Sequence, residues 1–139
     1  MSGYLLDTNV ISELAKTPPD RHVVTFLKTM DDPWVPVIAL YEIEYGLQLL
    51  PQGRRRNSIA AAMAGFLDEY SERTLSLDGE AAEYAGGLRA EAHRSGRRLR
   101  IADALIAGIA AANDLSLATR NVADFDYLPI EVTNPWQSA

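Results

Sequence analysis

The sequence predicts an α/β domain whose central sheet is mostly parallel. Short apolar segments rich in β-branched and aromatic residues alternate along the chain with longer segments of helical character. Turn-forming or helix-capping residues separate them, among them Pro18, Pro19, Asp20 and Asp78. Strands that alternate with helices in this way favour a sheet covered by helices. The 139 residues fit a single domain, residues 1–139, without a linker or a repeat.

Each predicted strand is a short apolar run bounded by polar or turn-forming residues. The predicted strands are residues 4–6, 34–38, 74–77 and 115–119, with 129–132 as a fifth at an edge. The predicted helices are a short one that ends near residue 16, then 21–28, 40–50, 54–70, 79–95 and 101–113. Asn9 or Ser12 is the expected cap of the first helix. The last helix is apolar on nearly all sides, so we expect it to be buried.

The composition excludes several kinds of site. The chain has no cysteine, which rules out disulfides, zinc–thiolate sites, iron–sulfur clusters and cysteine nucleophiles. It begins without the charged and apolar regions of a secretory signal. Its longest nearly uncharged run, residues 104–113, is too short to span a bilayer. We therefore expect a cytoplasmic protein that is not attached to a membrane.

The charge distribution limits how the chain could hold a nucleic acid. Its net charge is −6, whereas proteins that bind nucleic acid over a broad surface are usually basic. Phosphate binding would have to be local, through clustered arginines or through a cation that bridges carboxylates to phosphate. Arginines do cluster, at positions 54–56 and at 89, 94, 97, 98 and 100. For any single arginine, a solvated helix face is the simpler interpretation.

Acidic residues follow three of the predicted strands. In parallel sheets, ligands gather beyond the carboxyl ends of the strands. Another acid lies within the apolar helix 101–113, where a carboxylate is rare unless it is paired or bound to metal. These acids are Asp7 after the first strand, Glu42 and Glu44 after the second, Asp103 in the helix, and Asp124 and Asp126 after the fourth.

Structural roles compete with a functional one for several of these acids. Asp7 and Asp103 could each be a helix N-cap. Asp126 is better explained as an ordinary loop acid. Glu42 and Glu44 are two residues apart, which on a helix separates them by about 200°, so only one can face a shared site.

If three or four carboxylates converge, they repel one another and raise each other's pKa. A hard divalent cation such as Mg²⁺ or Mn²⁺ would relieve that repulsion, because these ions prefer oxygen ligands. Such an ion could activate water and stabilise the charge that develops in phosphodiester cleavage. Other chemistry is poorly supported: His22 and His93 lie near no apparent serine nucleophile, and the chain has no P-loop or dinucleotide-binding glycine motif.

Four blocks of the sequence resemble the PIN-domain ribonuclease toxins of the VapC and FitB type. The blocks are residues 5–14, 42–47, 101–107 and 117–125, and they occur in the family's order over nearly the whole chain. The resemblance implies a PIN-type α/β/α sandwich and a metal-dependent endoribonuclease, the toxin of a type II toxin–antitoxin system. It assigns Mg²⁺ or Mn²⁺ to the acids Asp7, Glu42 and Asp103, with Asp124 as a looser fourth member.

The resemblance also implies supporting residues and partners. Thr8, Asn9, Ser12 and Thr119 would orient the acids or a metal-bound water. At position 121 the family commonly has a polar or acidic residue, and Asn121 supplies no formal charge, so either Asp124 or Asn121 could complete the site. The implied partners are an RNA substrate, a second copy in a homodimer, and a cognate antitoxin that itself binds DNA.

Three other functions are compatible with acids at a sheet edge. A response-regulator-like phosphoacceptor domain also binds Mg²⁺, but it needs paired acids near the first strand and a lysine after the last. Lys16 and Lys28 both come early in the chain. A haloacid-dehalogenase-like phosphatase needs a second Asp two residues after the first, where this chain has Asn9. A catalytically silent PIN-like binding module remains the other alternative.

Overall fold

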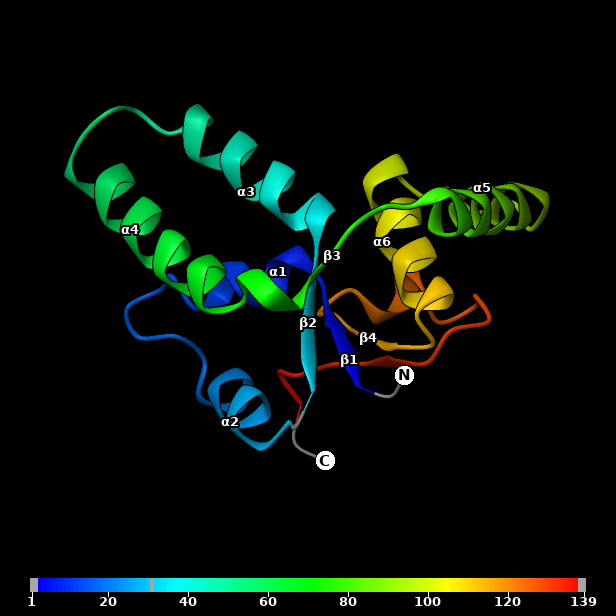
Figure 1. Cartoon of the computed structure of the whole chain (residues 1–139), viewed down its shortest axis with the longest axis horizontal. Helices are drawn as coiled ribbons and strands as arrows, with labels where there is room; N and C mark the ends of the chain where they lie inside the picture. Colours follow the sequence, from blue (N-terminus) through cyan, green and yellow to red (C-terminus); the bar gives the residue numbers. More distant parts are fainter. Residues whose placement is uncertain (1–2, 31, 138–139) are drawn as a thin grey trace.

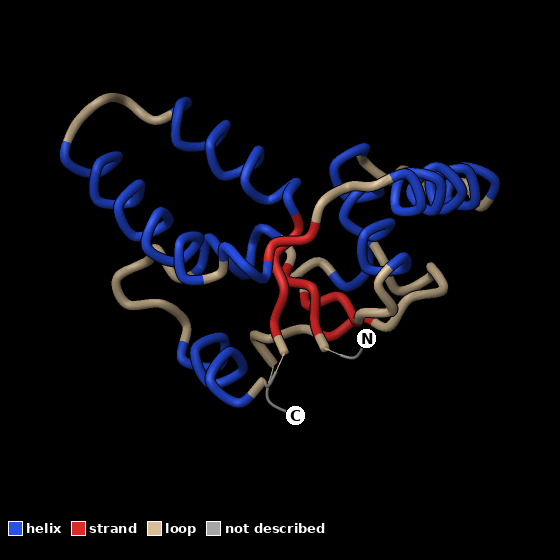
Figure 2. The backbone as a smooth tube through the Cα atoms, in the orientation of Figure 1, coloured by secondary structure: helices blue, strands red, loops and turns tan. Residues whose placement is uncertain are grey.

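The chain folds around a five-stranded sheet in which every strand pair is parallel, in the order β3-β2-β1-β4-β5. A computed structural model describes residues 3–30 and 32–137, and Figure 2 shows the strands at its centre. The strands are β1 (Tyr4–Leu6), β2 (Pro33–Pro36), β3 (Thr74–Leu75), β4 (Ser116–Ala118) and β5 (Val132–Thr133).

Helices cover both faces of this sheet, which confirms the predicted α/β/α sandwich. One side carries α1 to α4 and the other carries α5 and α6 (Figure 1). None of the described helices is both long enough and apolar enough to cross a membrane. The helices are α1 (Thr8–Glu13), α2 (Arg21–Thr29), α3 (Val37–Leu49), α4 (Arg54–Glu69), α5 (Gly79–Arg94) and α6 (Ile101–Ala112), with 3₁₀ turns at Ser71–Arg73 and Val122–Asp124.

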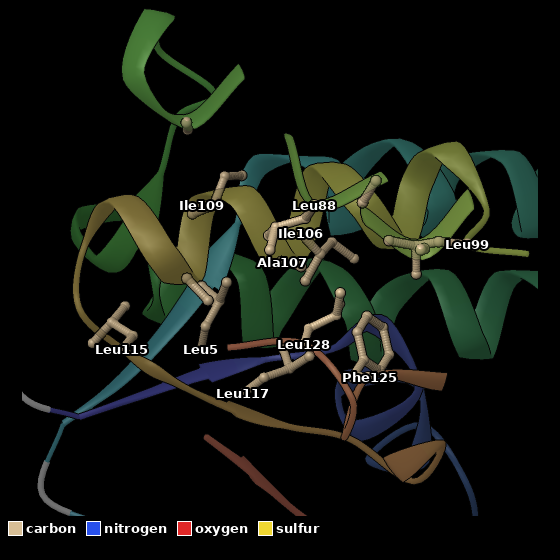
Figure 3. Close-up of a cluster of buried hydrophobic side chains, with 14 residues drawn as sticks. Leu5, Leu88, Leu99, Ile106, Ala107, Ile109, Leu115, Leu117, Phe125 and Leu128 are labelled. Carbon is tan, nitrogen blue, oxygen red and sulfur yellow. The ribbon is translucent and has the colours of Figure 1, made fainter. Parts of the chain in front are cut away.

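Strand alternation divides the core into two clusters, one on each face. Leu5 packs with α5 and α6, whereas the next residue, Leu6, packs with α1 to α4. Leu117 and Ala118 in β4 divide in the same way, as expected because successive side chains of a strand point to opposite faces. Figure 3 shows the first cluster, in which Phe125 is fully buried against the sheet.

Close packing of α5 against α6 fixes the position of α6. A Cβ atom at Gly108 would lie 2.7 Å from the Cβ of Ala85 and would also collide with the carbonyl oxygen of Ala81. Only glycine permits this approach of the two helices. Because α6 is held this closely, the acid in its first turn, Asp103, has a fixed place beside the sheet.

Several boundaries differ from the sequence prediction. Strand β3 covers only Thr74–Leu75 of the predicted 74–77, and β5 lies at Val132–Thr133 instead of 129–132. Strand β2 ends at Pro36, and α3 begins at Val37 instead of residue 40. Pro36 has the extended backbone of an N-cap, so the apolar residues after it form the first turn of a helix. Helix α1 is capped by Asp7, so the expectation of Asn9 or Ser12 as its cap was wrong. The extended backbone and short side chain of Asp7, directly before Thr8, meet the requirement for a cap.

Candidate active site

Asp7 is buried where β1 ends and α1 begins. Its Oδ1 accepts a hydrogen bond of 2.8 Å from the backbone N–H of Thr8, as a helix cap does. Its Oδ2 accepts a 2.7 Å hydrogen bond from the Thr119 hydroxyl and a 3.3 Å one from the Asn9 amide. Burial raises the pKa of Asp7, against the hydrogen bonds from Thr119 and Thr8. Asp7 can therefore be both a helix cap and a site residue, because Oδ1 caps α1 and Oδ2 belongs to the hydrogen-bond network of the site.

The end of β4 supplies the residues that hold Asp7 in place. Thr119 follows β4 directly and is fully buried. Its hydroxyl oxygen also accepts hydrogen bonds from the Asn9 amide at 3.4 Å and from the Asn121 backbone N–H at 3.1 Å. The side-chain Oδ1 of Asn9 accepts a hydrogen bond from the backbone N–H of Arg120 at 3.3 Å. Residues separated by more than a hundred positions thus form one network around the Asp7 carboxylate.

Glu42 faces this network from α3. Its Oε1 accepts a 2.7 Å hydrogen bond from the Thr8 hydroxyl, and its side chain is 19% exposed. Glu44, two residues later, is exposed to solvent. The expected divergence of the two acids around the helix is confirmed, and Glu42 is the one that turns inward.

Asp103 lies in the first turn of α6, and its side chain is 16% exposed. The helix cap is Arg100, so the interpretation of Asp103 as an N-cap was wrong. Burial raises the pKa of Asp103 to about 6; Arg100 opposes the rise, and the charges of Asp7, Glu42 and Asp124 add to it. The structure therefore brings Asp7, Glu42 and Asp124 within electrostatic reach of Asp103.

Arg100 is a site residue that the sequence did not single out from the other clustered arginines. Its guanidinium lies 3.2 Å from Glu42 Oε2 and 3.4 Å from Asp103 Oδ2. The only signal for it was its position directly before the helix that carries Asp103. Its side chain is 66% exposed, so it partly neutralises the acids from the solvent side.

The remaining predicted residues, Asp124, Asn121 and Ser12, differ in how closely they approach the acids. Asp124 is exposed in the 3₁₀ turn after β4, and its charge raises the pKa of Asp103. Asn121 contributes its backbone N–H to the network. Ser12 lies one turn beyond Thr8 on α1, about 6 Å farther along the helix. It borders a small hollow beside Glu42 but forms no hydrogen bond with an acid among the described residues.

The donor set suits a hard cation, although its present arrangement does not surround one. All the acids offer carboxylate oxygens, which Mg²⁺ and Mn²⁺ prefer. Within residues 3–30 and 32–137, no three acidic or histidine side chains are grouped as ligands around a common point. Instead, Arg100 pairs with two of the acids. Binding of a cation would require these exposed contacts to rearrange, and exposed ion pairs are weak.

Comparison with known proteins places this geometry in a family. The model of the PIN domain family matches residues 4–129. A VapC ribonuclease of Sinorhizobium fredii, Y4jK, is 34% identical over 97% of this chain and 99% of its own length. Toxin FitB of Neisseria gonorrhoeae is 32% identical over 95% of this chain and 97% of its own.

Solved structures agree with the sequence comparisons. The structure of FitAB bound to a DNA fragment superimposes with a TM-score of 0.88 at 31% identity, covering 98% of this chain and 97% of the other. The phosphoacceptor and phosphatase alternatives lose their support, because the resemblance extends over the whole fold and over the acid-bearing blocks. The chain belongs to the PIN domain family and, within it, to the group of the VapC and FitB ribonuclease toxins.

Proposed function

We propose that the chain is a metal-dependent endoribonuclease that acts as the toxin of a type II toxin–antitoxin pair in the cytoplasm. One observation carries the proposal: acids from separate elements converge at this site, with Asp7 and Glu42 linked through Thr8 and with Arg100 bridging Glu42 to Asp103. Asp124 lies close enough for its charge to act on Asp103. The relation to a VapC ribonuclease supports RNA as the substrate, and the relation to a FitB toxin supports the role of a toxin.

The acids would hold Mg²⁺ or Mn²⁺, with Asp7, Glu42 and Asp103 as the main ligands and Asp124 at the open side. A cation bound there would supply a positive charge that stabilises negative charge developing on the phosphate. Thr8 and Thr119 orient Glu42 and Asp7 through short hydrogen bonds. The exposed Arg100 guanidinium can turn from the acids to an RNA phosphate, for which its planar fork is well suited.

A cognate antitoxin and a second copy of the chain complete the proposal. The FitAB structure bound to DNA supports an antitoxin partner that binds DNA. Several large apolar side chains of α3 are exposed, which supports burial of this helix against a partner chain. They are Leu40, Tyr41, Tyr45 and Leu49.

Cleavage assays of purified variants test the assignment of the acids. With labelled RNA and Mg²⁺, we expect Asp7→Asn and Asp103→Asn to lose nearly all activity, because asparagine keeps the shape and loses the charge. Asp126→Asn, an equal change at an exposed loop acid, should keep it. Wild-type rates in either site variant would refute the acid assignment. No cleavage by the wild-type protein with any RNA would favour a catalytically silent binding module.

A further inference from the structure

A basic hollow lies at the end of α5, on the face of the molecule that also carries α6. It has a volume of about 580 Å³, and we call it the arginine pocket. Its polar lining comes from the last turns of α5 and the loop that leads to α6. These residues are Arg89, His93, Arg94, Arg97 and Arg98.

The arginines of this pocket lack carboxylate partners within the described chain. Elsewhere, Arg73 pairs with Asp32, and Arg100 pairs with Glu42 and Asp103. None of the four pocket arginines forms a salt bridge with a described residue, and Arg89 donates only to the backbone carbonyl of Leu99, at 3.2 Å. In a chain of net charge −6, this unneutralised concentration of positive charge fits an anionic ligand.

Tyr127 contacts an arginine of the pocket and is influenced by the charges of two of the acids. The Arg97 guanidinium lies over the Tyr127 ring, 4.4 Å from its centroid. The pKa of Tyr127 is raised mainly by burial, while Arg97 lowers it and the charges of Asp124 and Asp103 raise it further. The ring is therefore within electrostatic reach of both groups. Leu99 lines the pocket, and the next residue, Arg100, contacts the acids.

We propose that the arginine pocket binds backbone phosphates of the RNA strand on one side of the cleaved bond. The inference rests on the proposed function, and it specifies where part of the RNA substrate binds. Guanidinium groups pair with phosphate oxygens in a planar, two-bonded geometry. Such contacts position the strand without reading its sequence. Because the chain as a whole is negatively charged, RNA would be repelled elsewhere and attracted to the arginine pocket beside the acids.

The test uses the double variant Arg97→Gln/Arg98→Gln of the full chain. Its control is Arg54→Gln/Arg55→Gln, which removes the same charge from exposed arginines at the start of α4. Figure 1 shows α4 and α5 on opposite sides of the sheet. Both pairs are placed in an Asp103→Asn background with chelator, so that the RNA stays intact. Binding of a fluorescein-labelled oligouridylate is followed by anisotropy at increasing KCl.

We expect Kd to rise about tenfold in the pocket variant at moderate salt, since two charged contacts are lost. The slope of log Kd against log salt should flatten by about 1.4, which is two phosphates at about 0.7 each for a single strand. The control should shift neither quantity to this extent. Because Arg97 packs on Tyr127, Arg98→Gln alone is a second variant, and it should show about half the change in slope.

Equal affinity and slope in the pocket and control variants would overturn the inference, and an acidic protein partner would then be the better occupant. The proposed function is tested separately, by cleavage with the otherwise wild-type protein. There the pocket variant should raise KM for RNA and leave kcat nearly unchanged. Cleavage with an unchanged KM would refute the pocket while the ribonuclease assignment stands.

Discussion

Replacing Asp103 by asparagine should stabilise the metal-free protein at neutral pH. The folded protein raises the pKa of this carboxyl from 3.8 to about 6, mainly because the side chain is buried. Each pKa unit corresponds to about 1.4 kcal/mol, so the ionised carboxylate costs the folded state about 3 kcal/mol. That shift already includes the opposing attraction of Arg100. The variant also loses a favourable negative charge at the start of α6, worth up to about 1 kcal/mol. The net gain is about 2 kcal/mol.

The pH dependence of this gain has a defined sign. The folded state binds the Asp103 proton more tightly than the unfolded state does, so the free energy of unfolding falls as pH rises from about 4 to about 6. Asparagine has no such proton. Its advantage over wild type should be complete above pH 6 and absent below pH 4, where the aspartate is neutral in both states.

Thermal melting in chelator, at pH 4 and at pH 7, measures the effect. A gain of about 2 kcal/mol raises Tm by roughly 6 °C in a chain of this size. Asp126→Asn is the matched control, because that acid is exposed and its substitution should leave Tm nearly unchanged. If Asp103→Asn melts no higher than wild type at pH 7, or gains as much at pH 4, the inferred repulsion and burial at this site are wrong.

Three further predictions concern neighbouring residues and the metal. Glu42→Gln should reduce RNA cleavage far more than Glu44→Gln, and equal losses would show that the inward face of α3 is misassigned. Thr119→Val should lower the free energy of unfolding by about 1–3 kcal/mol in urea titrations, since a buried carboxylate loses a donor; an unchanged midpoint would contradict this. Saturating Mn²⁺ should stabilise the wild type by about 2.7 kcal/mol at a hundredfold excess over Kd. Equal Mn²⁺ shifts in wild type and Asp7→Asn/Asp103→Asn would remove these acids from the metal site.

Local sequence patterns predicted most of the fold because each element carries its own signals. The cap at Asp78 and the apolar run of α6 placed their helices almost to the residue. At Pro36 the same reasoning failed, because the residues after it are apolar and β-branched and suit either a strand or a buried helix. Tertiary packing made the choice there, and a single sequence does not contain that information.

Site residues could be predicted from the sequence where an acid occupies a position that has few structural explanations. An acid in the apolar α6 and an acid directly after β1 both pointed to the sheet edge. Arg100 was not distinguishable, since its contact with Glu42 joins residues 58 positions apart. Ser12 was expected to orient the acids, but helix geometry carries its hydroxyl one turn beyond Thr8. Long side chains and contacts between distant elements depend on the three-dimensional arrangement.

Metal dependence of RNA cleavage tests the central claim most directly. The purified protein is treated with excess chelator, dialysed, and titrated with Mn²⁺ or Mg²⁺ while cleavage of a fluorescent RNA is recorded. The account predicts no cleavage in chelator, a saturable return of cleavage with either ion, and no return in the Asp103→Asn protein. Cleavage that persists in chelator, or that returns equally in Asp103→Asn, would contradict a metal-dependent ribonuclease built on these acids.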